Sequence, residues 1–125
     1  KIVRRVISKE TSDVMKDLLI GVVEYGTGKS VRVKNLKIAG KTGTSQQLVG
    51  GTYSKSQYNA SFVGFFPADN PQIAMIVALD SPKGVYYGGS TAAPIFKNIT
   101  LRIISSSDIL AKPATNGLTA TAFAP

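Results

Sequence analysis

The sequence predicts an α+β fold in which an antiparallel sheet is flanked by helices. Three observations carry this prediction. Apolar residues recur at helical spacing in residues 14–23, and a second stripe of this kind occupies residues 95–103. Between them lie three strand-like runs joined by short connections rich in Gly, Pro, Asn and Asp. The expected order is therefore a helix, a three-strand meander and a C-terminal helix.

The first helix is expected to begin after Ser8, whose hydroxyl suits an N-cap. Glu10 and Asp13 lie in its first turns, where the helix dipole favours acidic groups. Residues 26–28, Gly-Thr-Gly, are expected to end it. Its apolar face is predicted to consist of Val14, Met15, Leu18, Leu19, Val22 and Val23. Before the helix, residues 1–7 alternate as a short strand does.

The three strands are predicted over residues 36–45, 58–66 and 72–80. A polar turn at residues 49–56 joins the first two, and "PADNP" joins the second and third. The third run, "QIAMIVALD", is apolar without alternation. This pattern is typical of a strand that is covered on both faces.

The second helix is expected to begin near Ser90 or Thr91, with Pro94 in its first turn. Its predicted buried stripe is Ile95, Phe96, Ile99 and Ile103. Residues 105–125 are rich in Ser, Ala, Thr and Pro and have no periodicity, so we expect a disordered tail. The domain is accordingly placed at residues 1–104.

The tyrosines at positions 53, 58, 86 and 87 are each expected to pack against the body of the domain. Tyr86 and Tyr87 stand beside glycines in the loop "SPKGVYYGGS", so they also suit the rim of a cleft.

The composition limits the chemistry that the chain can perform. Its 125 residues contain no Cys and no His, which excludes thiolate metal sites, disulfides and an imidazole base. The net charge of +8 favours anionic partners, but the basic residues are scattered as on a solvated surface. We expect no metal, cofactor or nucleic acid. No apolar run reaches the roughly 20 residues that span a bilayer. The start, "KIVRRVISKE", is no signal peptide and lacks Met, so we expect a piece of a longer protein.

The stretch "IAGKTGTSQ" contains Gly-Lys-Thr, the ending of a phosphate-binding P-loop. That loop requires a Gly five positions before the Gly of Gly-Lys-Thr, and Asn35 stands there. For Gly28-Lys29-Ser30 the same position is Val23, inside the predicted helix. A P-loop also leads from a strand into a helix, whereas this stretch leads into another strand. The nucleotide interpretation is therefore disfavoured.

On a strand, the same residues suit a carboxylate. Alternation places Thr42 and Thr44 on one face, about 7 Å apart, and Lys41 and Gly43 on the other. Two hydroxyls can converge on one carboxylate, and the lysine adds a positive charge. Gly43 has no Cβ, so the backbone of a substrate can approach closely, as in strand addition.

Three stretches resemble the transpeptidase domain of class B penicillin-binding proteins, which cross-link peptidoglycan. They are "AGKTGTSQ", "YNASFVGFFPADNPQIAMIV" and "YYGGSTAAPIFKNI", preceded by "GVVEYGTGKS". Their order and spacing match the family from about residue 6 to residue 104. The resemblance implies a β-lactamase/transpeptidase-like fold, of which this chain is the C-terminal portion.

By this resemblance, Lys41 is the active-site lysine that relays protons and favours an anionic substrate. Thr42 and Thr44 bind the carboxylate of the stem peptide or of a β-lactam, and the Thr44 N–H forms half of the oxyanion hole. Ser45 and Gln46 line the continuing strand.

The family's other two motifs, Ser-x-x-Lys and Ser-x-Asn, are missing from these residues. No serine has Lys three positions later or Asn two positions later. We therefore expect the nucleophile in upstream sequence, and we expect this chain to be inactive alone.

The resemblance implies a peptidoglycan D,D-transpeptidase that acts through a serine acyl-enzyme and is acylated by β-lactams. Such proteins are anchored in the bacterial inner membrane, with the catalytic domain in the periplasm or outside the cell. A serine β-lactamase or a β-lactam sensor of the same superfamily is an alternative. A basic module that binds anions is the non-enzyme alternative.

In the family, the strand equivalent to residues 72–80 pairs on its far side with a strand from the N-terminal part of the domain. That part is therefore an expected partner. Without it, the strand presents an apolar edge, which favours aggregation. The chain alone is expected to be poorly soluble or to exchange strands.

Overall fold

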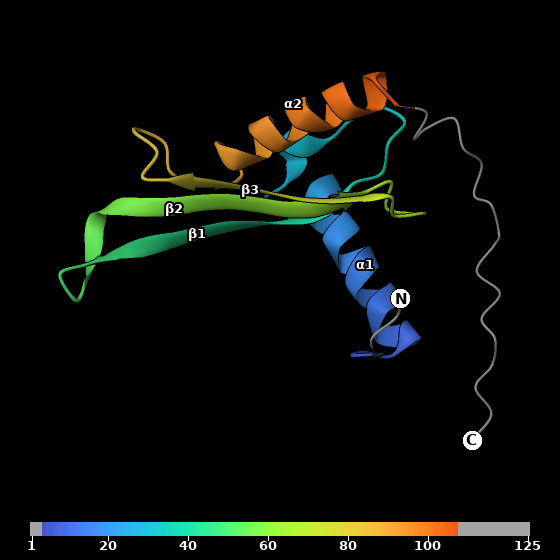
Figure 1. The fold of residues 1–125 in the computed structure, drawn as a ribbon, viewed down its shortest axis with the longest axis horizontal. Helices are drawn as coiled ribbons and strands as arrows, with labels where there is room; N and C mark the ends of the chain where they lie inside the picture. Colours follow the sequence, from blue (N-terminus) through green and yellow to red (C-terminus); the bar gives the residue numbers. More distant parts are fainter. Residues whose placement is uncertain (1–3, 108–125) are drawn as a thin grey trace.

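The computed structural model describes residues 4–107, which form two helices, a short 3₁₀ helix and one sheet (Figure 1). In chain order these are α1 (Lys9–Glu24), η1 (Lys29–Val31), β1 (Ala39–Val49), β2 (Thr52–Phe66), β3 (Ile73–Asp80) and α2 (Ala92–Ser105). The predicted α+β class and its element order are confirmed. The disordered tail was predicted over residues 105–125; Ser105 is instead the last residue of α2, and residues 108–125 lie outside the described residues.

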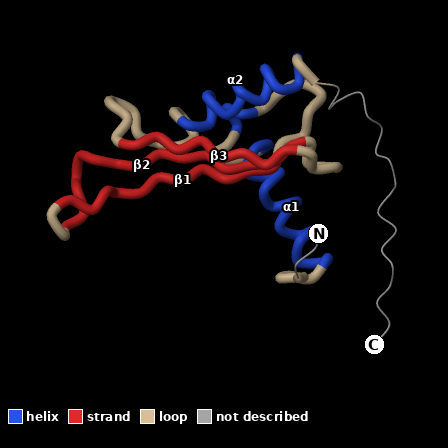
Figure 2. The backbone as a smooth tube through the Cα atoms, in the orientation of Figure 1, coloured by secondary structure: helices blue, strands red, loops and turns tan. Residues whose placement is uncertain are grey.

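The three strands form an antiparallel sheet in the order β1-β2-β3 (Figure 2). The turn between β1 and β2 is shorter than predicted, because Val49 pairs directly with Thr52. Gly50 and Gly51 have φ of 59° and 80°, which allows a two-residue hairpin. Both strands therefore extend through most of the region predicted as a turn.

Helix α1 begins as predicted, because Ser8 Oγ accepts a hydrogen bond from the Thr11 N–H at 3.1 Å. The predicted strand before it is wrong for residues 4–7, which have no strand pairing, while residues 1–3 lie outside the described part. Much of its predicted apolar face is uncovered: Val14 and Leu18 are 59% and 60% exposed, whereas Val23 is buried. In the described part of the chain, no helix is both long and apolar enough to cross a bilayer.

The core lies between the sheet and α2, which covers one face of the sheet (Figure 1). The Phe96 ring packs edge-on against Phe62 and Phe66, with ring centroids 4.8 Å and 6.1 Å apart. The predicted stripe of α2 is only partly right, because Ile95 and Ile99 are 39% and 36% exposed. The side that packs consists of Ala92, Ala93, Phe96 and Thr100. Ile103 of the predicted stripe packs against the core, whereas Ile95 and Ile99 are turned outward.

Strand β3 alternates in burial, contrary to the prediction that both faces are covered. Val77 is 9% exposed and faces the core, whereas Ile76 is 67% exposed. The cause is that α1 contacts β1, at the far edge of the sheet, so the second face of β3 has no cover from the described elements.

Candidate active site

The predicted binding segment lies in β1, the strand at one edge of the sheet. Thr42 and Thr44 pair with Phe62 and Ala60, both buried, so the two hydroxyls lie on the face of the sheet that carries the core. Within the described residues β1 has a neighbour on one side only, β2. Its other edge is therefore available for an extended chain to pair with.

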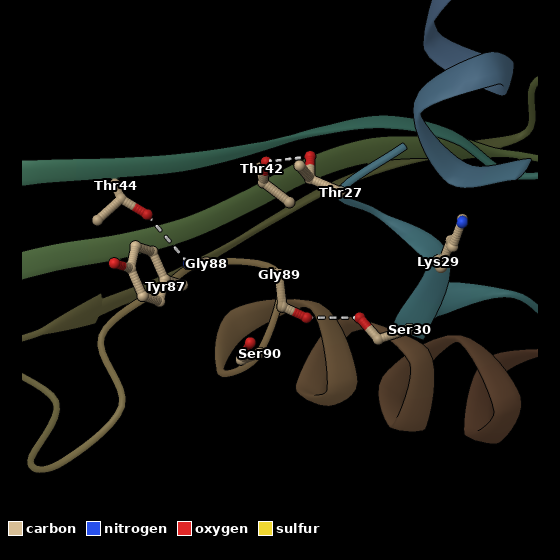
Figure 3. Close-up of a pocket in the computed structure, with 9 residues that line it drawn as sticks. All are labelled: Thr27, Lys29, Ser30, Thr42, Thr44, Tyr87, Gly88, Gly89 and Ser90. Carbon is tan, nitrogen blue, oxygen red and sulfur yellow. Dashed lines mark hydrogen bonds between the residues drawn. The ribbon is translucent and has the colours of Figure 1, made fainter. Parts of the chain in front are cut away.

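Among the described residues the Thr42 hydroxyl has two partners, Lys41 and Thr27, of which Figure 3 shows Thr27. Thr27 Oγ1 lies 2.8 Å from Thr42 Oγ1, and Lys41 Nζ donates to the same oxygen at 3.3 Å. Lys41 Nζ also donates to the Thr42 carbonyl at 2.8 Å. The lysine leaves the strand on the opposite face, but its ammonium group curls back, so the cation lies beside the hydroxyl.

Thr27 reaches β1 because α1 ends at a tight glycine turn. The N–H groups of Gly26 and Gly28 both donate to the Val22 carbonyl, at 3.1 Å and 3.0 Å, which reverses the chain. Gly28 is buried, and a Cβ at this position would lie 3.3 Å from the Phe62 ring. The glycine therefore lets the turn lie against the sheet, next to Thr42.

The Thr44 hydroxyl is held from the loop that precedes α2. The Gly88 N–H donates to Thr44 Oγ1 at 3.1 Å (Figure 3). Gly88 is buried, and the space that its Cβ would take is occupied by the carbonyl oxygens of Ser61 and Gly43. The next residue is fixed as well, since Ser30 Oγ donates to the Gly89 carbonyl at 2.6 Å.

These contacts enclose an open pocket of about 400 Å³ above the threonines. Its lining residues are Thr27, Lys29, Ser30, Thr42, Thr44, Tyr87, Gly88, Gly89 and Ser90. Six of these side chains carry a hydroxyl, Lys29 is basic, and none is acidic. Hydroxyl donors with a cation and no competing carboxylate make a site for an anionic group.

The family model of the penicillin binding protein transpeptidase domain matches residues 1–101. The chain belongs to this family. The resemblance found in the sequence is thereby confirmed.

Two curated members of the transpeptidase family show how much of a full protein the chain represents. It is 44% identical over 97 residues to stage V sporulation protein D of Bacillus subtilis, covering 77% of this chain and 15% of that protein. It is 37% identical over 127 residues to a probable peptidoglycan D,D-transpeptidase PenA of Neisseria flavescens, a match that covers 98% of this chain and 31% of that protein. The chain therefore spans less than a third of the length of these relatives.

A solved structure of the transpeptidase family has the same fold. It is penicillin binding protein 3 of Mycobacterium tuberculosis, complexed with ampicillin, which superposes with a TM-score of 0.74 at 31% identity. The match covers 84% of this chain and 26% of that one. The likeness confirms the β-lactamase/transpeptidase-like fold class.

The structure divides the five residues that the sequence predicted for this transpeptidase-family site. Thr42 and Thr44 line the pocket together, and the Lys41 ammonium group reaches Thr42 from the other face. Gly43 and Ser45 are not pocket-lining residues. We predicted that the absence of a Cβ at Gly43 lets a substrate approach closely, but the Ser61 hydroxyl occupies that space.

Sequence reasoning missed most of the remaining pocket, namely Thr27, Lys29, Ser30, Gly88, Gly89 and Ser90. The Gly-Thr-Gly of residues 26–28 was interpreted as the end of a helix and as part of the family resemblance, and no role in the site was assigned to it. Its two glycines, and the Gly88-Gly89 pair, carried a usable signal, because glycine is favoured where two backbones approach closely.

Tyr87 lines the pocket, and at 58% exposure it does not pack against the body of the domain as was expected. The Tyr58 and Tyr86 rings stack with centroids 4.0 Å apart, which agrees with a packing role for both. Tyr86 donates a hydrogen bond to the Tyr87 hydroxyl, and this contact raises the pKa of Tyr86 to about 12. Tyr53 was expected to pack as well, but it is 68% exposed near the hairpin turn.

No group of three metal-ligating side chains occurs among residues 4–107. The chemistry that the described residues offer is hydrogen bonding to an anion, with a lysine beside it.

Proposed function

We propose that this chain forms the Lys-Thr-Gly side of the active site of a peptidoglycan D,D-transpeptidase. The observation that carries the proposal is the pair of hydroxyls on Thr42 and Thr44, which line one pocket at an open strand edge, with the Lys41 ammonium group beside them. Membership of the transpeptidase family supports the same activity.

The pocket is proposed to bind the terminal carboxylate of a stem peptide that ends in D-Ala–D-Ala. Thr42 and Thr44 donate to its oxygens, and Lys41 supplies the opposite charge. The peptide pairs with the free edge of β1 through the backbone of Thr44, whose neighbours Gly43 and Ser45 turn their own N–H and C=O groups toward β2. An extended ligand needs this edge for its own N–H and C=O groups.

The reaction requires a serine that we propose lies outside these 125 residues, since they contain neither Ser-x-x-Lys nor Ser-x-Asn. Its oxygen forms a bond to the penultimate carbonyl carbon, the C–N bond to the last D-Ala breaks, and the leaving amine takes up the serine proton. An amine of a neighbouring peptide then attacks the ester, and the serine regains a proton. Lys41 takes part in this relay, and the Thr44 N–H stabilises the oxyanion.

The same site is proposed to accept β-lactams, whose carboxylate lies near the reactive carbonyl as it does in the peptide. The relative from M. tuberculosis is a complex with ampicillin. We further propose that the complete protein is membrane-anchored with its catalytic domain outside the cytoplasm, and that the rest of the transpeptidase domain is the partner of this chain.

The two alternatives have less support. Relatives that cover most of this chain are named as transpeptidases, which favours that activity over a β-lactamase or a sensor. A nucleic-acid module would offer aromatic faces beside its basic residues. In this chain Phe62 and Phe96 are buried, and the Tyr58 face is stacked on Tyr86.

The test is labelling by a fluorescent penicillin of the full-length protein that contains this chain. The wild type should form a covalent adduct that persists, whereas a β-lactamase would release it rapidly. Lys41→Ala and Thr42→Ala should label far more slowly, by about a hundredfold for loss of the lysine. The 125-residue chain should not label, and covalent labelling of this chain alone would contradict the placement of the nucleophile.

A further inference from the structure

The two threonines of the pocket face the same geometric problem. A hydroxyl has one proton, so it can donate to an anion only if that proton is not already donated to another group, whereas its lone pairs can still accept from neighbouring donors. For Thr44 the donor is the Gly88 N–H, at 3.1 Å from Oγ1. This N–H cannot accept, so the Thr44 proton is free to point into the pocket.

The Thr42 hydroxyl has two neighbours: Lys41, which donates to it, and the Thr27 hydroxyl, which can donate or accept. Lys41 Nζ lies 3.3 Å from Thr42 Oγ1 and makes its shorter bond, 2.8 Å, to the Thr42 carbonyl. Thr27 Oγ1 lies 2.8 Å from Thr42 Oγ1 and is the nearer of the two partners of the hydroxyl. Either threonine can donate in this pair, so the direction depends on what else is in the pocket.

An anion in the pocket sets that direction. A hydrogen bond to a carboxylate is roughly twice as strong as one between neutral groups, so the Thr42 proton turns toward the anion. The Thr27–Thr42 contact then persists only if Thr27 donates. The result is a chain of donors from Thr27 to Thr42 to the carboxylate, in which each bond polarises the next.

We infer that Thr27 is a positioning residue for carboxylate recognition, which acts by donating to Thr42 and directing the Thr42 proton into the pocket. The inference rests on the proposed function, because it takes the bound anion to be the carboxylate of a peptide or β-lactam. It adds a residue from the Gly-Thr-Gly turn after α1 to a site otherwise built on β1.

The surroundings of Thr27 allow an experiment to distinguish its role in orienting the Thr42 proton from a role in folding of the turn. Its side chain is exposed, while its backbone carbonyl lies against Gly89, where a Cβ would meet it at 2.5 Å. Packing of the turn therefore depends on the backbone, and the hydroxyl is left for Thr42. Val has nearly the same shape as Thr and also branches at Cβ, so Thr27→Val removes the donor and keeps the turn.

The experiment measures the second-order rate constant of acylation by benzylpenicillin in the full-length protein. Thr27→Val should lower it about three- to tenfold, the usual range for one hydrogen bond. Thr27→Ser keeps the donor and should restore most of the rate. In a Thr42→Val background, Thr27→Val should have no further effect, because its target hydroxyl is gone.

A ligand control separates recognition from loss of active protein. The methyl ester of benzylpenicillin has no anionic carboxylate, so Thr27→Val should slow its acylation less than that of the acid. The ratio of the two rate constants does not depend on the fraction of folded protein.

The outcomes distinguish this inference from the proposed function. Labelling of the wild type with an unchanged rate in Thr27→Val would overturn the role of Thr27 and leave the transpeptidase site intact. Equal slowing of acid and ester, or additive effects of the two valine substitutions, would also overturn it. A wild-type protein that does not label would overturn the proposed function and this inference with it.

Discussion

Replacing Gly88 with alanine should displace the loop before α2 from the sheet and slow acylation. The new Cβ would lie closer to the carbonyl oxygens of Ser61 and Gly43 than real Cβ atoms come. Gly43 and Ser61 are paired residues of β1 and β2, so their carbonyls cannot withdraw without disturbing the ladder. The loop must therefore move instead, and the 3.1 Å bond from the Gly88 N–H to Thr44 is lost with it.

The magnitude follows from two terms. Overpacking of a close contact costs about 1–3 kcal/mol, and one lost hydrogen bond adds about 0.5–1.5 kcal/mol. We therefore expect the free energy of unfolding to fall by about 2–4 kcal/mol. A shift of about 1 Å at a residue that orients the ligand can reduce a rate about a hundredfold.

The assay is fluorescent penicillin labelling, with urea unfolding of the same full-length protein. The matched control is Gly84→Ala in the same loop, where φ is +82° and a Cβ would meet nothing within 4 Å. It should lose about 1–2 kcal/mol through left-handed strain but label at close to the wild-type rate. If Gly88→Ala labels and unfolds like the wild type, then the loop does not depend on this close approach, and our account of Thr44 is wrong.

Four further predictions concern the fold and its surroundings. Phe96→Ala empties the centre of the core and should lower the free energy of unfolding by about 3–5 kcal/mol in a urea titration. Gly21→Ala should raise it by about 0.5–1 kcal/mol, because this position in α1 has open space for a Cβ and Ala is the better helix former. The pKa of Tyr86 is raised from 10.0 to about 12, so the hydrogen bond of its protonated phenol stabilises the fold fully below pH 10, and this stabilisation is lost as the pH rises through about 12. In an absorbance titration one phenol should ionise later than the others, and Tyr86→Phe should remove that step. The 125-residue chain alone should self-associate, as measured by light scattering. Ile76 is 67% exposed, and Ile76→Lys should reduce the self-association. A monodisperse wild-type monomer would contradict the prediction.

The elements of the fold were predictable where their causes are local. Ser8 caps the start of α1, and Gly26 and Gly28 follow its end. Each of these residues acts on the helix turn next to it, so its effect can be predicted from the local sequence. The prediction that Thr42 and Thr44 lie on one face of β1 is confirmed, because successive side chains of a strand alternate between its two faces.

Burial was harder to predict, because it depends on which elements cover which face. The apolar run of β3 indicates a strand, but periodicity does not say that Ile76 would lack a covering element. For the same reason, the apolar residues Val14 and Leu18 identify a helix without showing what packs on them. In α2 the residues Ala92, Ala93 and Phe96 are buried while Ile95 is 39% exposed, and apolar spacing alone does not say which of them faces the core.

The pocket was predictable only in its β1 part, since its remaining contacts join residues far apart in sequence. Thr27 lies 15 residues from Thr42, and Gly88 lies 44 residues from Thr44. No pattern within a single element encodes such pairs. The glycines that permit the close approaches are the nearest the sequence comes to marking them.

The site separates recognition from attack, and this separation has a consequence for experiments. The groups proposed to hold the carboxylate come from the α1 turn, β1 and the loop before α2, whereas the nucleophile is proposed to come from another segment. Changes at Thr27, Thr42 and Gly88 should therefore converge on one quantity, the rate constant of acylation by ligands that carry a carboxylate. Changes at Phe96 and Gly21 should alter stability first, and the rate only through the fraction of folded protein. A core variant such as Phe96→Ala could keep the wild-type fraction of folded protein and still change the ratio of the acylation rate constants for benzylpenicillin and its methyl ester. In that case carboxylate recognition would depend on the core as well, and the hydrogen bonds from Thr27 to Thr42 to the carboxylate would not be sufficient to explain it.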